Sequence, residues 1–418
     1  MPICSTGSNC KEGESMKYNF SDIINRTGKD ALAIDGVGTI PGISPGKPKA
    51  GFDFIPMWVA DMNFATAPAV TAALQERLQH PLYGYFIPSP DYYHAIIRWH
   101  HQRNGVTGLQ RRYIGYENSV IGGMLQALKV FCSPGDAVLI HAPTYIHFTD
   151  GLQDNGYRMI ASPLVKDREG IWRMDYGDME RKIRKYRIHA AIFCSPHNPT
   201  GRVWELDELQ QMMELFRKHN VFVISDEIWS DIILGNNHHI PLQSVSADAR
   251  ERTVALYALT KTFNLAGIGG AYHIIYNRML RERIVGENKK TYGTELNVLA
   301  MHALIGAYSP EGQEWTEELC QVLTQNVAFA CAYISRHFDG VQLSAPQGTY
   351  MLFLDCSEWC TAHHRTLDEL LQAGYDIGVG WQDGRPFFGP THIRMNVALP
   401  FSLLEEALHR LDRYVFHP

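Results

Sequence analysis

The segment TVALYALTKTFNLAG, residues 253–267, passes from a short apolar run into a polar turn. The run contains the β-branched and aromatic residues that are typical of a buried strand. Lys261 follows at the point where the strand should end and the chain should turn. A lysine in such a place is usually a solvated loop residue, so its meaning depends on the side chains that end the neighbouring strands.

Similar apolar runs recur along the chain, and helix-like spans such as ELDELQQMMELFRKH (205–219) lie between several of them. This alternation predicts an α/β fold with a mainly parallel sheet covered by helices. After about residue 310 the pattern changes to a long helical stretch, a few strands and a closing helix, which predicts a second, smaller α+β domain. The further runs are DAVLIHA (136–142), HAAIFCSP (189–196), VFVISDE (221–227), GAYHIIY (270–276), GTYMLFLD (348–355) and THIRMNVAL (391–399).

Composition limits the possible partners of this chain. Its 418 residues are 45% hydrophobic and 20% charged, which is enough for a large buried core. The net charge of −6 leaves no cationic excess for nucleic acid. We see no apolar run of about 18 residues and no leader-like start, so we expect no membrane contact and a cytoplasmic location.

The eight cysteines contain no C-x-x-C motif, so we expect free thiols. The histidine pairs lack the spacing of metal ligands, so we expect no metal site.

Three polar residues end predicted strands: Asn198, Asp226 and Lys261. In open sheets of this kind ligands bind beyond the carboxyl ends of the strands. Asp226 follows VFVIS directly, and a buried carboxylate there needs a partner. A buried cation, a helix N-terminus or the protonated ring nitrogen of a cofactor would each serve. Asn198 has an ordinary alternative role, because Asn-Pro is also a turn signal.

Two further segments favour a phosphorylated ring as the ligand. SVIGGMLQALKVF (119–131) places two glycines at a predicted helix start, where free amides and the helix dipole can hold a phosphate. Helix packing alone explains one glycine more easily than two. In HAPTYIHF (141–148), Tyr145 follows a strand end, where an aromatic ring can stack on a flat ligand. A phosphorylated pyridine aldehyde needs this combination of lysine, carboxylate, hydrogen-bond donor, aromatic ring and phosphate site.

The order G-G, Tyr, N-P-x-G, S-D-E-I, T-K-T-F-N-L-A-G and R-x-N resembles the pyridoxal-phosphate (PLP) enzymes of fold type I, aminotransferase class I/II. The resemblance covers nearly the whole chain beyond residues 1–20. Several segments resemble the branch of cystathionine β-lyases and other cysteine-S-conjugate β-lyases, including the MalY and PatB type. These segments are FIPMWVADMNF (54–64), LYGYF (82–86), SPHNPTGRVW (195–204), TKTFNLAGI (260–268) and QGTYMLFLD (347–355).

For the fold, the resemblance implies a large PLP-binding domain, with a mainly parallel seven-stranded sheet between helices, and a smaller α+β domain. We expect an N-terminal arm with part of the small domain at 1–55, the large domain at 56–305 and the C-terminal small domain at 306–418.

For the site, the resemblance implies that Lys261 holds the cofactor as a Schiff base and then acts as base and acid at Cα. Asp226 would hold the pyridinium proton. Arg394 would bind the substrate carboxylate as a bidentate partner, although a surface ion pair is its structural alternative. The further expected contacts are Asn198 to the phenolic oxygen, Tyr145 stacked on the ring, Gly122, Gly123, Met124 and Thr260 at the phosphate, Tyr83 from a second subunit, and the backbone of Ala60 near the substrate carboxylate.

Some positions depart from the family pattern. Gly269 stands where many aminotransferases have a phosphate-binding arginine, Thr260 replaces a usual serine, and Trp229 replaces a frequent tyrosine. The missing arginine argues against an ordinary aminotransferase, so we expect a PLP-dependent C–S β-lyase that cleaves cystathionine or related L-cysteine S-conjugates to a thiol, pyruvate and ammonia. We expect a homodimer because Tyr83 would reach the site of a second subunit. The alternative is an aminotransferase acting on a small or aromatic L-amino acid, and a second role in binding a regulator is also open.

Overall fold

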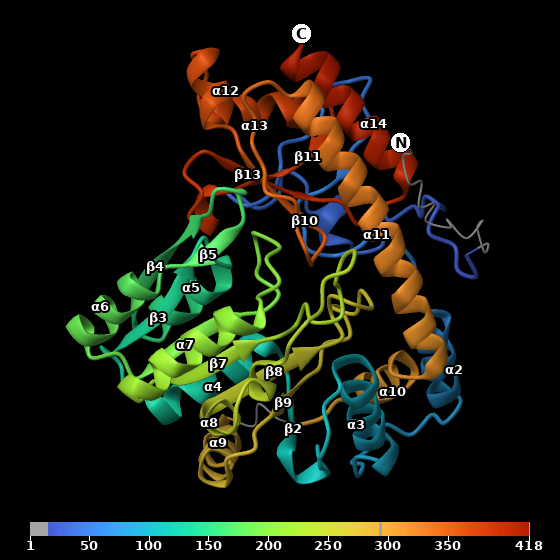
Figure 1. Ribbon diagram of the computed structural model, residues 1–418. Coiled ribbons are helices and arrows are strands. Elements are labelled where there is room, and N and C mark those ends of the chain that lie inside the picture. Colours follow the sequence, from blue (N-terminus) through green and yellow to red (C-terminus); the bar gives the residue numbers. More distant parts are fainter. Residues whose placement is uncertain (1–15, 292–294, 418) are drawn as a thin grey trace, which may run out of the picture.

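The computed structural model describes residues 16–291 and 295–417 (Figure 1). A large sheet and its helices form the lower part of the view, and a smaller group of strands and helices lies above it. Helix α11 (Pro310–His337) runs from the lower part to the upper one. At the lower level α11 contacts α2 (Pro68–Leu78) and α10 (Val298–Ala307), and it also packs on α14 (Phe401–Leu411).

The main sheet has eight strands within the described residues, in the order β2-β9-β8-β7-β6-β3-β4-β5. The central pairs β4/β3, β3/β6, β6/β7 and β7/β8 are parallel, whereas β8/β9, β2/β9 and β4/β5 are antiparallel. The strands are β2 (Ile114–Glu117), β3 (Ala137–Ala142), β4 (Arg158–Lys166), β5 (Trp172–Met174), β6 (Ala190–Cys194), β7 (Phe222–Asp226), β8 (Thr253–Ala258) and β9 (Ala271–Ile274).

The mainly parallel sheet is confirmed, but the predicted number of seven strands is wrong. One edge strand, β5, is only three residues long and contains no extended apolar run that would reveal it in the sequence. It pairs with β4 through a turn in which Gly170 adopts a φ of 78° and its N–H donates to the carbonyl oxygen of Asp167 at 3.0 Å.

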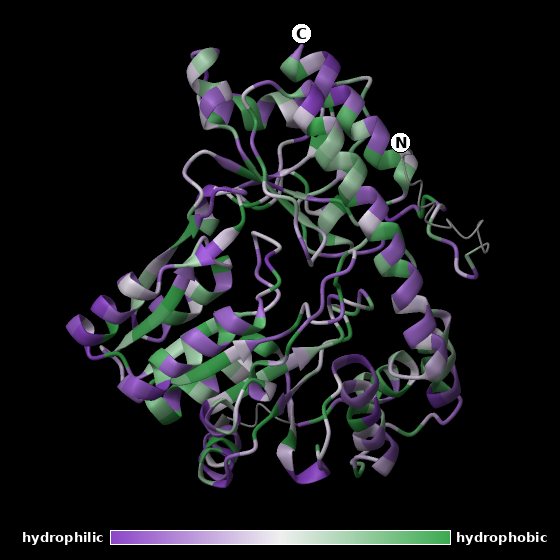
Figure 2. Ribbon diagram, in the orientation of Figure 1, coloured by the Kyte–Doolittle hydropathy of each residue, from purple (hydrophilic) through white to green (hydrophobic). Residues whose placement is uncertain are grey.

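Alternate residues of each central strand face different helices. In β3, Val138 and Ile140 join a core with α4 (Val120–Phe131), α5 (Ile146–Asp154) and α9 (Arg278–Thr291). Ala137 and Leu139 join the opposite core with α6 (Tyr176–Tyr186), α7 (Leu206–His219) and α8 (Ala247–Arg252). This period of two is the geometry of a strand buried on both faces. Figure 2 shows the central strands in hydrophobic colours and polar residues along the outer sides of the helices.

Helix ends agree with the sequence at α7 and differ at α2. The predicted helix 205–219 is confirmed as α7, which begins with a reciprocal capping box between Glu205 and Glu208. At α2 the sequence TAPAVTAALQERLQ (66–79) predicts a helix with Thr66 as its cap, but Ala67 occupies the N-cap. The hydroxyl of Thr66 instead donates to the carbonyl oxygen of Phe263 at 2.7 Å, so this side chain ties the start of α2 to the turn after Lys261.

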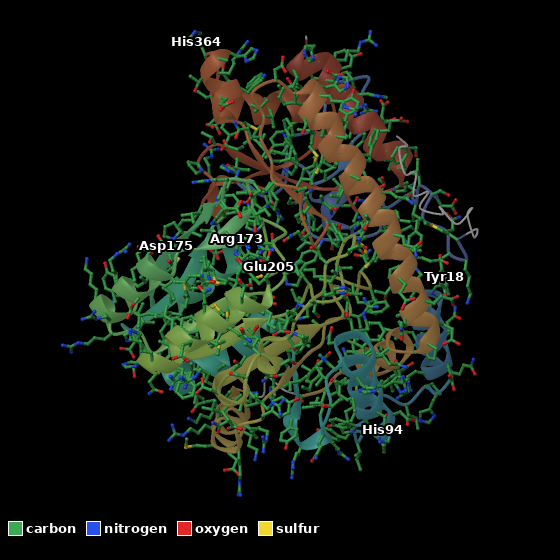
Figure 3. The ribbon with its side chains drawn as sticks, viewed as in Figure 1. Tyr18, His94, Arg173, Asp175, Glu205 and His364 are labelled. Atoms are coloured by element: carbon green, nitrogen blue, oxygen red, sulfur yellow. The ribbon has the colours of Figure 1, made fainter. Side chains whose placement is uncertain are left out.

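The ion pairs at α7 fasten the loop that follows β6. Arg173 of β5 points toward Glu205 in Figure 3, with Nη1 3.1 Å from Oε2. Arg202 is buried between Glu205 and Glu208 and also donates to the side chain of Gln347. The loop that carries Asn198 is thereby held against the segment before β10.

The upper group contains the sheet β10-β13-β12, formed by β10 (Met351–Asp355), β13 (His392–Asn396) and β12 (Gln382–Asp383). The short strand β1 (Ile55–Pro56) pairs with β11 (Val379–Gly380), so the chain near the predicted boundary at 55/56 joins the C-terminal part. The division into domains remains a prediction. The remaining α-helices of the described residues are α1 (Leu32–Asp35), α3 (Pro90–Asn104), α12 (Ser357–Ala362) and α13 (Leu367–Asp376).

Within the described parts of the chain, none of the helices has the length and apolar character that crossing a membrane requires.

Candidate active site

A cavity of about 230 Å³ lies where β6, β7 and β8 end. Five of the residues predicted from the sequence line it, and it also contains the first residues of α4 and the turn at Gly269 and Gly270. The five predicted residues are Tyr145, Asn198, Asp226, Thr260 and Lys261.

Lys261 is half-buried in this cavity, three residues after the last residue of β8. Its Nζ donates to the carbonyl oxygen of Ala60 at 3.0 Å and lies 5.7 Å from the centre of the Trp229 ring. Burial lowers the pKa of the Lys261 amine to about 8, and the nearby Arg394 guanidinium acts in the same direction. An amine with such a pKa is a nucleophile and a base near neutral pH.

Asp226 is the last residue of β7, and its side chain is buried beneath the cavity. One carboxylate oxygen accepts a hydrogen bond from the backbone N–H of Ile228 at 3.0 Å. Burial raises the pKa of Asp226 to about 7, which means that the carboxylate is costly here without a positive partner. A protonated ring nitrogen placed in the cavity would supply that partner.

Arg394 lies in the middle of β13, opposite Phe353 of β10 and Gln382 of β12. It is 3% exposed, and its Nη atoms donate to the side-chain oxygens of Asn198 and Gln382 and to the carbonyl oxygen of Trp58. The alternative of a surface ion pair is therefore wrong. Within the described residues its Nε–H has no acceptor, and burial lowers the pKa of the guanidinium to about 10. A buried cation among neutral groups is suited to a carboxylate ligand.

Asn198 connects Arg394 to the cavity. Its side-chain oxygen accepts from Nη1 of Arg394 at 3.2 Å, so its amide nitrogen remains available as the donor toward a ligand. Tyr145 occupies the N-cap of α5, as expected for a residue just past a strand end. Burial raises the pKa of the Tyr145 phenol to about 12, so it stays protonated near neutral pH.

The loop of residues 58–63, which we call the active-site loop, contributes backbone carbonyls. The carbonyl oxygen of Ala60 accepts from Lys261 and also from the hydroxyl of Tyr350 at 3.1 Å. The carbonyl oxygen of Trp58 accepts from Arg394 at 3.2 Å. The sequence placed Ala60 near the substrate and missed Tyr350 and Trp58. We find no sequence signal for these contacts, because they join backbone atoms to side chains hundreds of residues away.

The predicted helix start at the cavity is confirmed, but the cavity wall comes from earlier residues than those predicted. Helix α4 begins at Val120 with Ser119 as its N-cap, and the lining residues are Ser119, Val120 and Ile121 rather than Gly122, Gly123 and Met124. The N–H of Gly122 donates to the Ser119 hydroxyl oxygen, and the N–H of Gly123 donates to the Ser119 carbonyl oxygen. These two amides are already used within the helix start.

Tyr83 lies apart from the cavity that contains Lys261. Its side chain is 54% exposed and borders a separate cavity of about 660 Å³, together with Tyr85 and Phe86. The expectation that Tyr83 completes the site of a second subunit therefore stays a prediction.

A family model described as aminotransferase class I and II matches residues 53–411. The chain belongs to this family. Among curated members it is 31% identical over 396 residues to cystathionine beta-lyase PatB of Bacillus subtilis (strain 168), covering 94% of this chain and 98% of the relative. It is also 31% identical over 399 residues to protein MalY of Escherichia coli (strain K12), covering 94% and 97%.

Among solved structures, this family member is similar to cystalysin from Treponema denticola, whose crystal structure contains pyridoxal 5'-phosphate. The TM-score is 0.86 at 27% identity, covering 96% of this chain and 99% of that one. These relatives confirm the resemblance and the fold type that the sequence predicted.

The six described cysteines are free, whereas Cys4 and Cys10 lie outside the described residues. In the part of the chain that the structure describes, no group of three or more His, Cys, Asp or Glu side chains is arranged to hold a metal ion.

Proposed function

We propose that this protein is a PLP-dependent C–S β-lyase that cleaves cystathionine or related L-cysteine S-conjugates to a thiol, pyruvate and ammonia. The observation that carries the proposal is that Lys261 and Asp226 line one cavity, whose wall residue Asn198 accepts a hydrogen bond from Arg394. The names of PatB and of the other cystathionine β-lyase relatives support this reaction class.

The cavity fits the cofactor. Asp226 needs a cationic partner, Asn198 has a free amide donor, and Ser119–Ile121 present a helix start suited to a phosphate. We therefore assign the phosphate to the start of α4, with Thr260 beside it, in place of Gly122, Gly123 and Met124. When bound, PLP withdraws the electron pair that remains at Cα after the proton has left.

This chain's own residues bind the amino acid and move its proton. Arg394 binds the α-carboxylate, which also gives the guanidinium the anion that its buried site lacks. Lys261, with its lowered pKa, takes the proton from Cα. Loss of the thiolate from Cβ then gives the unsaturated product, whose hydrolysis yields pyruvate and ammonia. Tyr145 and Trp229 enclose the cavity and exclude water around these groups.

The assembly that we propose is a cytoplasmic homodimer in which Tyr83 reaches the partner's site. Support comes from the exposed apolar side chains around Tyr83, since Leu82 is 68% and Ile87 is 85% exposed. Apolar residues at such exposure are unusual next to a large cavity unless another surface covers them. We propose no membrane or nucleic-acid partner.

A single-turnover experiment tests the function. The purified holoenzyme is mixed with L-cystathionine, and pyruvate, ammonia and pyridoxamine phosphate are measured. Stoichiometric pyruvate and ammonia with the original absorbance restored would support β-elimination. Pyridoxamine phosphate without pyruvate would instead make the protein an aminotransferase. Failure to acquire a PLP absorbance band would contradict the role of Lys261 itself.

A further inference from the structure

The N-terminal segment 17–26, which we call the strap, lies along α11 and ends beside the active-site loop. Its first residues are fixed on α11, because the backbone N–H groups of Lys17 and Tyr18 donate to the two carboxylate oxygens of Glu318. The hydroxyl of Tyr18, labelled in Figure 3, donates to the carbonyl oxygen of Glu311. Further along, Phe20 is buried and packs edge-on against Phe64, at 5.4 Å between ring centres.

At its other end the strap contacts the active-site loop through Arg26. Nη2 of Arg26 lies 2.5 Å from Oδ2 of Asp61, and both side chains are less than one-fifth exposed. Nη1 donates to the side-chain oxygen of Asn63 at 2.9 Å and to the carbonyl oxygen of Met62. Arg26 therefore binds three consecutive residues of the loop, which suits a planar guanidinium with several donors.

The same loop carries the backbone atoms that contact the reacting groups. Ala60, the neighbour of Asp61, accepts from Lys261, and Trp58 accepts from Arg394. The charged groups that act on the Lys261 amine are Arg394, Asp226 and Asp61. Asp61 is the member of this set that Arg26 neutralises.

We propose that Arg26 is a positioning residue, which holds the Asp61 carboxylate and thereby fixes the active-site loop through which Ala60 contacts Lys261 and Trp58 contacts Arg394. Loss of Arg26 frees the Asp61 carboxylate, on the residue next to Ala60, to turn toward the Lys261 amine, so Lys261 binds its proton more tightly. It also releases the loop whose Trp58 carbonyl orients Arg394. The effect on Lys261 is expected whichever reaction the protein catalyses with PLP, whereas the effect on Arg394 rests on the proposed function.

The test compares Arg26→Ala, Asp61→Asn and the double variant as holoenzymes. The visible absorbance of the bound cofactor is measured as a function of pH. Its titration midpoint reports the protonation of the Lys261 nitrogen and requires no turnover. We expect the midpoint to rise in Arg26→Ala and to fall in Asp61→Asn. In the Asp61→Asn background, the additional Arg26→Ala substitution should move the midpoint little, because the carboxylate through which Arg26 acts is gone.

If Arg26→Ala shifts the titration midpoint equally in the wild-type and Asp61→Asn backgrounds, Arg26 acts as a distant charge and not through Asp61. If the midpoint is unchanged in Arg26→Ala, Arg26 has no effect on Lys261. Either result would overturn the proposal. Lys17→Met is the matched control, since Lys17 pairs with Glu314 at the opposite end of the strap and should leave the midpoint unchanged. A shift in this control equal to that of Arg26→Ala would assign the effect to the strap as a whole and also overturn it.

Steady-state kinetics with L-cystathionine give the second readout. In Arg26→Ala we expect KM to rise roughly tenfold with a smaller change in kcat, because the loop contact that orients Arg394 is weakened. If the wild-type enzyme does not cleave cystathionine, the proposed function fails while the absorbance titration still decides the role of Arg26.

Discussion

The Arg394 guanidinium is held by neutral acceptors on three sides and lies 4.3 Å from the centre of the Phe387 ring. Its plane is thereby fixed before a substrate arrives. A lysine at this position would keep the positive charge, but it could neither donate two parallel N–H bonds to a carboxylate nor stack on the Phe387 ring.

We predict that Arg394→Lys raises KM for L-cystathionine roughly 30- to 150-fold, which corresponds to about 2–3 kcal/mol for a charge-assisted pair. Initial-rate kinetics measure this effect. Arg252→Lys is the control, because Arg252 pairs with Asp248 within α8 and should leave KM unchanged. A wild-type KM in Arg394→Lys would contradict carboxylate binding at this position.

Asp226 gives a prediction on stability in the cofactor-free protein. Its pKa is raised from 3.8 to about 7, so the native state binds a proton more tightly than the unfolded state does. The stability cost of this carboxyl therefore grows as pH rises from about 4 to 7 and is constant above that range. Asp226→Asn should stabilise the cofactor-free protein, and this gain should increase across the same interval.

Urea unfolding of both proteins at several pH values measures that gain. Asp167→Asn is the control of opposite sign. A hydrogen bond from Arg173 lowers the pKa of Asp167, so its removal should destabilise the protein at neutral pH and matter less as pH falls. A pH-independent gain in Asp226→Asn would contradict the buried, unpaired state of this carboxyl.

At the scale of single elements, the two glycines of α4 have different roles. A Cβ at Gly123 would lie 2.8 Å from Cδ2 of Leu256 and 2.9 Å from Cγ of Glu117. A Cβ at Gly122 would meet only the Ser119 hydroxyl oxygen, at 3.1 Å. The absence of a side chain at Gly123 therefore allows α4 to lie close against β8.

We predict that Gly123→Ala lowers the free energy of unfolding by about 1–3 kcal/mol through overpacking. Gly122→Ala, the matched variant, should change it by less than about 1 kcal/mol. Equilibrium unfolding in urea compares the two. Equal losses would mean that neither glycine is required by the approach of helix to sheet.

The strand ends were predictable from the sequence because an apolar run stops where its strand leaves the core. Asp226 ends one such run and Lys261 lies three residues beyond the end of another, and the structure places both at one cavity. The residues of α4 that line the cavity were not predicted, because the sequence does not show that Ser119 caps α4 and that the cavity wall begins there. Tyr350 and Gln382 could not be predicted, because their contacts depend on how distant segments pack.

At the scale of the whole molecule, the proposed dimer predicts complementation between two defective variants. Lys261→Ala lacks the amine, and Tyr83→Ala would lack the residue given to the partner. A mixed dimer then contains one site with both defects and one intact site. After unfolding and refolding together in equal amounts, the mixture should recover up to about one quarter of wild-type activity.

Pyruvate release by the refolded mixture is the measurement, and each variant refolded alone is the control. Activity no higher than the average of the two separate variants would place Tyr83 and Lys261 in the same chain's site, or Tyr83 in no site.

The contact between Trp58 and Arg394 joins residues 336 positions apart in the chain. During synthesis, Lys261 and the strands around it leave the ribosome well before Arg394 is made. At roughly 5 to 20 residues per second, this interval is on the order of ten seconds. A nascent chain can therefore acquire the groups that hold the cofactor before it can select an amino acid, so the capacity to recognise substrate is the last property of the site to be translated.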